Sequence, residues 1–120
     1  MPEFGLCVTT TNRKSIADKL ARILVHSKLS ACVNIVENIK SVYSWREKVV
    51  RDREYLVIIK TRKNRIKKVQ GVILEKHNYQ LPEFIWFKIG GQALNFLNGW
   101  EKIPVRNSLS KNKTCLCSVI

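Results

Sequence analysis

The sequence predicts an α+β fold in which two helices pack on one face of an antiparallel sheet. Apolar residues make up 45% of the 120 residues, which suffices for one hydrophobic core and argues against intrinsic disorder. Hydrophobic residues recur at helical spacing in two segments, and four further segments are apolar or alternating and rich in β-branched or aromatic residues. These segments follow one another as strand, helix, strand, strand, helix and strand, an order typical of an α+β sandwich.

The first strand and the first helix are predicted over residues 4–10 and 13–29. The strand segment is apolar and ends in a run of threonine and asparagine, whose side chains are good helix N-caps. Ile16, Leu20 and Ile23 then recur on one face of a helix, while the charged residues fall largely elsewhere.

The next two strands are predicted to form a long hairpin. Alternate residues over 31–45 are mostly apolar, with an interruption at Glu37, so this strand is expected to bend near Asn38. The charged segment at 46–53 suits a turn or the distal part of the hairpin. The following strand, at 55–59, is apolar at every position, which is typical of a strand covered on both faces.

A second helix at 62–77, a fourth strand at 82–87 and a short third helix at 93–100 complete the predicted elements. The fourth strand begins with a proline, at a position where a missing N–H is tolerated. Toward the C-terminus the sequence turns polar and basic. We therefore predict a single domain over residues 1–103 and a poorly ordered basic tail over 104–120.

Two split βαβ units in this order form a ferredoxin-like sandwich, here with an additional C-terminal helix. Both helices of such a fold cover the same face of the sheet, so the other face stays uncovered in a monomer. The predicted strands are nevertheless apolar on both faces and carry several aromatic residues: Tyr43, Trp45, Phe84, Trp86 and Phe87. An exposed aromatic surface of this extent marks a subunit interface, which predicts an oligomer.

Composition and motifs narrow the functional class. The 22 basic and 9 acidic residues give a net charge of +13, which attracts polyanions. No charge-free stretch approaches the roughly 20 apolar residues of a membrane span, and no N-terminal secretory pattern is visible, so we expect a cytoplasmic protein. The sequence has no phosphate-binding loop, nucleophile elbow or zinc-protease motif, which indicates a protein that is not an enzyme.

One run of bases contains no acid: Lys60, Arg62, Lys63, Arg65, Lys67 and Lys68. Such a run suits either a patch that contacts nucleic-acid phosphates or a solvated helix face. We favour the solvated face, because the sequence has no RNA-recognition signature and its aromatic residues fall mainly in the predicted core or interface.

Three ordered motifs resemble those of the CutA divalent-ion tolerance family. Residues 19–22 (Lys-Leu-Ala-Arg) with 29–35 (Leu-Ser-Ala-Cys-Val-Asn-Ile) are similar to its helix-to-strand signature. Residues 41–45 (Ser-Val-Tyr-Ser-Trp), followed by Ile-Ile-Lys-Thr at 58–61, are similar to its central hairpin. Residues 77–83 (His-Asn-Tyr-Gln-Leu-Pro-Glu) look like its His-Pro-Tyr-x-x-Pro-Glu motif, with asparagine in place of the first proline.

The resemblance extends from about residue 4 to residue 101. It implies a ferredoxin-like subunit in a tight homotrimer, in which sheet edges and the long hairpin cross between subunits. The family is also similar in architecture to PII-type signalling trimers, which place ligand clefts between subunits. By resemblance, the chain is a binding or regulatory protein associated with tolerance of divalent metal ions such as copper.

The motif at 77–83 supplies the candidate binding residues. By resemblance, His77, Tyr79 and Glu83 line a cleft between subunits. A structural interpretation stays open for two of them. His77 can serve the C-terminal end of its helix by bonding the last carbonyls, and Glu83 can pair with one of the many nearby bases.

Only part of the metal site of the family's copper-binding relatives carries over. His77 is the matching ligand, and imidazole suits copper, zinc and nickel. Thr9 and Lys76 stand where those relatives have a cysteine and can have a second histidine. Cys7 lies two residues before Thr9 on the same strand face and is a substitute thiolate. A site with a divalent metal as cofactor typically requires three or four ligands.

The other cysteines have simpler interpretations. Cys32 is expected to be a buried core residue, since cysteine behaves as a small hydrophobe. Cys115 and Cys117 form a pair in the predicted tail, which suits either two ligands for a soft metal or incidental thiols. Two further functional classes stay open for the whole chain: a basic nucleic-acid-binding module and a non-catalytic scaffold trimer.

Overall fold

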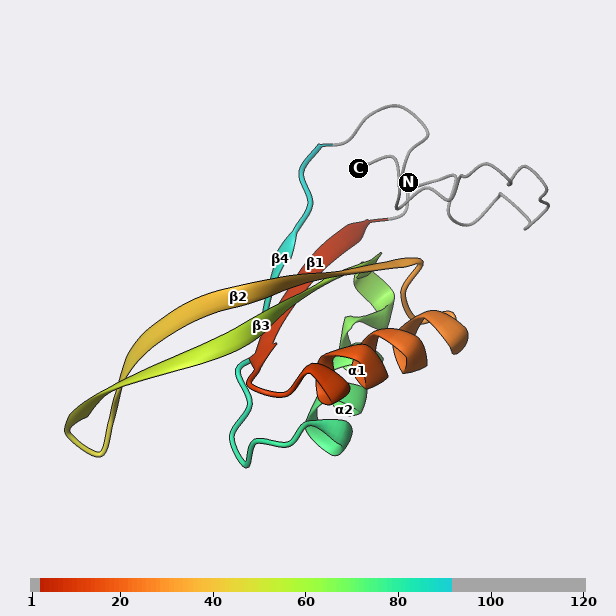
Figure 1. Cartoon of the computed structure of the whole chain (residues 1–120). Helices are drawn as coiled ribbons and strands as arrows, with labels where there is room; N and C mark the ends of the chain where they lie inside the picture. The colour runs from red at the N-terminus through yellow and green to blue at the C-terminus, as the bar shows by residue number, and fades with distance from the viewer. Residues whose placement is uncertain (1–2, 92–120) are drawn as a thin grey trace.

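The computed structural model describes residues 3–91, and there the predicted order of elements is confirmed (Figure 1). The elements are β1 (Phe4–Thr11), α1 (Lys14–His26), β2 (Cys32–Trp45), β3 (Lys48–Arg62), a short 3₁₀ turn η1 (Lys63–Arg65), α2 (Ile66–Lys76) and β4 (Ile85–Lys88). The predicted helix at 93–100 and the predicted tail at 104–120 lie outside the described residues.

The strands form one antiparallel sheet in the order β2-β3-β1-β4. β1 pairs with both β3 and β4, so the two βαβ units interleave as a ferredoxin-like sandwich requires. α1 and α2 pack against each other on one face of the sheet (Figure 1). Within residues 3–91, no element covers the opposite face.

The hydrophobic core fills the space between the helices and the sheet. Helical spacing places three apolar residues of each helix on one face, and strand alternation points the matching sheet residues toward them. The buried core residues are Ala17, Leu20 and Leu24 on α1, Ile66, Val69 and Ile73 on α2, and Cys7, Val57 and Ile59 on the sheet. Burying one leucine or isoleucine stabilises a fold by about 1.5–3 kcal/mol, so this face anchors the domain.

α1 is shorter at both ends than predicted. It begins after Arg13, which makes no side-chain capping bond, so the predicted capping by the threonine and asparagine run is wrong. Thr11 belongs to β1 instead, and its Oγ1 accepts a 3.3 Å hydrogen bond from the Arg13 N–H. The helix ends early because Lys28 adopts a left-handed conformation, with φ 64°, and the N–H groups of Leu29 and Ser30 bond to the Leu24 carbonyl.

β2 and β3 form the predicted long hairpin, which extends well beyond the two-helix layer (Figure 1). The register shifts between Val36 and Ile39, where two residues of β2 face one residue of β3. Asn38 takes φ 63° at this β-bulge, a conformation that asparagine tolerates better than most residues. The predicted bend near Asn38 is therefore confirmed.

The charged segment after β2 is the distal part of the hairpin rather than a long turn. Trp45 pairs with Lys48, so the turn itself consists only of Arg46 and Glu47, with φ 52° and 67°. Positive φ at both positions matches the right-handed twist of a two-residue hairpin. β3 therefore extends from Lys48 instead of residue 55, since Lys48, Arg51 and Arg53 stay paired with β2 while their side chains face solvent.

The uncovered face of the sheet is apolar, as the sequence predicts. The pairing register places apolar residues from all four strands on this face: Leu6, Val8, Val36, Leu56, Ile58, Ile85 and Phe87. Val36, Ile85 and Phe87 are exposed, and the other four are partly buried. Tyr43 and Trp45 are exposed farther out on the hairpin, whereas Phe84 packs against the core. No helix among the described residues is long and apolar enough to cross a membrane.

Candidate functional site

His77 connects the end of α2 to the end of β1. Its backbone N–H bonds to the Ile73 carbonyl at 3.0 Å, which closes the last turn of the helix. Its ring nitrogens both have partners in the chain: Nδ1 accepts from the Tyr79 N–H at 3.0 Å, and Nε2 lies 2.8 Å from the Thr10 carbonyl oxygen. Because Nδ1 accepts a bond, the proton of the neutral ring belongs on Nε2, which donates to Thr10.

The surroundings of His77 favour this neutral ring. Burial lowers the pKa of His77 below its ordinary value, while the bond to the Thr10 carbonyl and the charge of Glu54 act in the opposite direction. The His77 ring therefore does not bond the last carbonyls of its own helix, as the structural interpretation expected; only its backbone N–H closes the helix, and the ring bonds to β1 and to Tyr79 instead. A metal ion at this residue has to replace one of the two ring hydrogen bonds.

Tyr79 joins the same cluster to the base of the hairpin. Its ring lies 4.8 Å from the His77 ring, centroid to centroid, with an interplanar angle of 46°. Its hydroxyl donates a 2.5 Å hydrogen bond to Oε2 of Glu54, which is only 6% exposed. Burial raises the pKa of Tyr79 well above its ordinary value, and the bond to Glu54 raises it further, so the hydroxyl stays a donor.

Asn78 ties the motif to the end of β1 through its side chain. Its Oδ1 accepts from the Thr11 hydroxyl at 2.6 Å, and its Nδ2 donates to Oδ1 of Asn12 at 2.9 Å. This asparagine stands where the family motif has proline. Side-chain hydrogen bonds to the β1 terminus therefore hold the segment at this position, where the motif has the fixed φ of a proline.

Glu54 and Asn78 are the residues of this cluster that the sequence did not point to. Glu54 is the single acid directly before an apolar strand segment, and an acid in that position is a signal for a buried hydrogen-bond acceptor. Its partner Tyr79 lies 25 residues farther along the chain, beyond the end of α2, so their proximity exists only in the folded chain.

Glu83 lies apart from the bonds that join the other motif residues. Its side chain is exposed and forms no ion pair within residues 3–91, so the alternative pairing with a nearby base is not seen there. Its backbone carbonyl accepts a 2.6 Å hydrogen bond from the Thr9 hydroxyl. Thr9, at the family's cysteine position, therefore orients the chain entering β4.

Cys7 lies in the core. It is a free thiol with no exposed surface, opposite Ile59 on β3 and Trp86 on β4. Burial raises the pKa of Cys7 to about 11, so the thiol is protonated at neutral pH, whereas a metal binds the thiolate. Within residues 3–91, no three histidine, cysteine, aspartate or glutamate side chains gather in a way that could hold a metal ion. Cys32 is buried, as predicted, and Cys115 and Cys117 lie outside this part of the chain.

Several bases of the run between residues 60 and 68 make contacts within the fold. Lys63 forms a 3.1 Å ion pair with Glu3, Arg65 donates a 3.0 Å hydrogen bond to the Lys28 carbonyl, and the Arg62 guanidinium lies 5.7 Å from the centre of the Phe4 ring. The run also divides among β3, the 3₁₀ turn and α2, so it does not form one continuous charged strip.

A family model described as the CutA1 divalent ion tolerance protein matches residues 5–102. The chain belongs to the CutA1 divalent ion tolerance family. The resemblance carried by the three sequence motifs is confirmed, including the continuation of the match beyond β4.

Individual CutA proteins agree with this result. The chain is 41% identical over 107 residues to the chloroplastic protein CutA of Arabidopsis thaliana, covering 89% of this chain but only 58% of that protein. It is 36% identical to the divalent-cation tolerance protein CutA of Thermus thermophilus, covering 74% of this chain and 86% of that protein. The crystal structure of CutA1 from Oryza sativa superposes with a TM-score of 0.80 at 37% identity, covering 89% of this chain and 97% of that one.

Proposed function

We propose that this CutA1-family chain works as a homotrimeric, non-catalytic binding or regulatory protein in the tolerance of divalent metal ions, with copper the first candidate. Ligands bind in clefts between subunits, and the protein acts in the cytoplasm. The observation that carries the assembly is the uncovered apolar face of the sheet, together with the family to which the chain belongs.

The uncovered face has the character of an interface. Its members come from every strand, and its outermost side chains, Val36, Ile85 and Phe87, are each nearly half exposed. Soluble monomers rarely expose a contiguous apolar surface of this kind. Copies of the sheet that meet through this face bury it. Pairing of sheet edges between subunits, which the family resemblance implies, also protects the edge strands β2 and β4.

The ligand cleft is proposed at the cluster formed by His77, Tyr79 and Glu54, with the exposed Glu83 as a further lining residue. The cluster lies where β1 ends and the hairpin leaves the sheet, so a neighbouring subunit that packs on the hairpin closes it. The hydrogen bonds to Thr10 and Glu54 hold both rings in place before a ligand arrives. Such pre-organisation reduces the entropy cost of binding.

A matched pair of valines tests the assembly. Val36 on the uncovered face and Val25 on α1 are each 40% exposed, so Val36→Glu and Val25→Glu add the same charge at equal exposure. We expect light scattering to show three chain masses for the wild type and for Val25→Glu, and a smaller species for Val36→Glu. A wild-type chain that is monomeric at micromolar concentration contradicts the proposal.

The two histidines provide a similar control for the metal. His77→Ala is expected to abolish the heat of copper binding in a calorimetric titration, whereas His26→Ala, at an exposed position on α1, is expected to retain it. Circular dichroism confirms that each variant is folded. Unchanged copper affinity in His77→Ala removes His77 as a ligand without affecting the trimer.

A further inference from the structure

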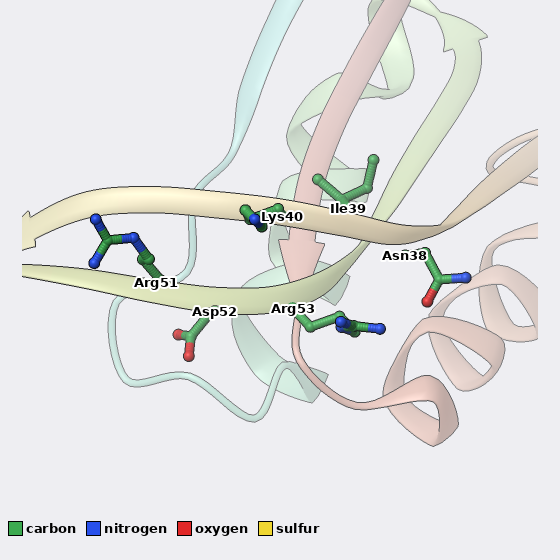
Figure 2. Close-up of a pocket in the computed structure, with 6 residues that line it drawn as sticks. All are labelled: Asn38, Ile39, Lys40, Arg51, Asp52 and Arg53. Carbon is green, nitrogen blue, oxygen red and sulfur yellow. The ribbon is translucent and has the colours of Figure 1, made fainter.

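A hollow of about 310 Å³ lies on the flank of the hairpin, next to the β-bulge. Both strands line it, with three bases, one acid, one amide and one apolar side chain, and Figure 2 shows these residues: Asn38, Ile39, Lys40, Arg51, Asp52 and Arg53. A volume of this size lies at the lower end of the range for small-molecule sites.

The pairing register brings the three bases to one face of the hairpin. Lys40 on β2 lies directly opposite Arg53 on β3. Arg51 lies two residues before Arg53 on β3, and therefore on the same face. Like charges directly opposite each other on a two-stranded ribbon destabilise it. Within residues 3–91, no acid forms an ion pair with any of the three.

The one acid beside the hollow does not neutralise these bases. Asp52 lies between Arg51 and Arg53 in sequence, so its side chain belongs to the other face of the strand, and Figure 2 shows it directed away from the Arg51 guanidinium. Its carboxylate accepts a 2.5 Å hydrogen bond from the Tyr43 hydroxyl on that other face.

We propose that the hollow binds a small anion that carries two or more phosphate groups. Two arginine forks, one ammonium and the Asn38 amide supply the donors, and arginine matches phosphate oxygens through paired N–H bonds. Opposite residues of a hairpin are about 5 Å apart, and alternate residues of one strand about 7 Å, so the three long side chains start close enough together to reach linked phosphates.

Two features favour a small ligand over a nucleic acid. The basic face stops within the hollow, because the next residues outward on that face are Val42, Ser44 and Val49. A site that follows a nucleic-acid backbone needs a longer row of charges. The basic face is also opposite the face that carries Tyr43 and Trp45, so assembly through the apolar surface leaves it accessible.

Calorimetric titration of the full chain with pyrophosphate tests the site. We expect binding that weakens with salt, a loss of affinity of about tenfold or more in Arg53→Gln, and a smaller loss in Arg53→Lys, which keeps the charge but not the fork. Lys48→Gln removes one charge from the tip of the same hairpin and is expected to stay within about twofold of the wild type.

Thermal unfolding separates binding from a role in folding. Without pyrophosphate, Arg53→Gln is expected to unfold at a temperature no lower than the wild type, because the change relieves the repulsion with Lys40. With pyrophosphate, the wild type and Lys48→Gln are expected to gain more stability than Arg53→Gln. The proposal is overturned if the chain does not bind pyrophosphate, whether or not it binds a single-stranded oligonucleotide. It is also overturned if Lys48→Gln and Arg53→Gln lose pyrophosphate affinity equally.

Discussion

β2 and β3 form one continuous hairpin whose two halves are stabilised in different ways. On the sheet side of the bulge, Val57 and Ile59 are fully buried beneath the helices. On the distal side, Val42 and Val49 are more than half exposed, and no described element covers either face. Because an isolated two-stranded ribbon is marginal in water, the distal half of a single subunit is stabilised mainly by its cross-strand pairs.

The difference shows that the length of these strands exceeds what the core of one subunit requires. The helix layer needs only the proximal strands, and the bulge at Asn38 marks where the hairpin leaves that layer. The bulge and the Tyr79–Glu54 bond lie at this junction, so the candidate site is placed between a rigid half and an exposed half.

The largest contrast is expected between two residues of β3. Ile59→Ala removes a fully buried side chain and is expected to lower the free energy of unfolding by about 2–5 kcal/mol. Val49→Ala removes a side chain that is 67% exposed, and we expect a change within about 0.5 kcal/mol. Urea denaturation at one fixed protein concentration measures both. A loss at Val49 equal to that at Ile59 shows that the distal half is buried in the assembly.

Two tyrosine–carboxylate bonds sharpen the comparison further. Tyr79→Phe leaves the buried Glu54 without its hydroxyl donor, which is expected to cost about 1–3 kcal/mol of unfolding free energy. Tyr43→Phe removes a bond of the same 2.5 Å length to Asp52 in the exposed half, and no measurable loss is expected there because water replaces the hydroxyl. Equal losses in the two variants contradict the difference in burial on which this prediction depends.

The smallest expected effect is a pH dependence at the junction. Since the folded state lowers the pKa of His77, the unfolded chain binds more protons around pH 6.5, and stability falls as the pH falls through that region. The melting temperature of the wild type should fall as the pH is lowered from about 7.5 to 5.5. His77→Gln is expected to lose less over the same interval, whereas His26→Gln should follow the wild type. Identical slopes for all three proteins remove His77 as the cause.

Periodicity predicted the element order well, and its errors have physical causes. The first helix was predicted to continue to residue 29, because sequence spacing does not show that Lys28 turns left-handed. The fourth strand was predicted from residue 82 but begins at Ile85, since the Thr9 hydroxyl holds the Glu83 carbonyl before β1 pairing starts. Of the candidate site, His77 and Tyr79 were predicted from the motif, while Glu54 was not, because its partner lies 25 residues away.

The sequence by itself determined the α+β order of elements, the apolar character of both sheet faces and the family, because periodicity and motifs are local properties of the chain. Only the tertiary structure decided the hydrogen-bond partner of each His77 ring nitrogen and made Glu54 the buried acceptor for Tyr79. It also decided that Lys40, Arg51 and Arg53 share one face of the hairpin. Those relations depend on strand register and on a bulge of one residue, and a shift of one position reverses the face of every side chain that follows.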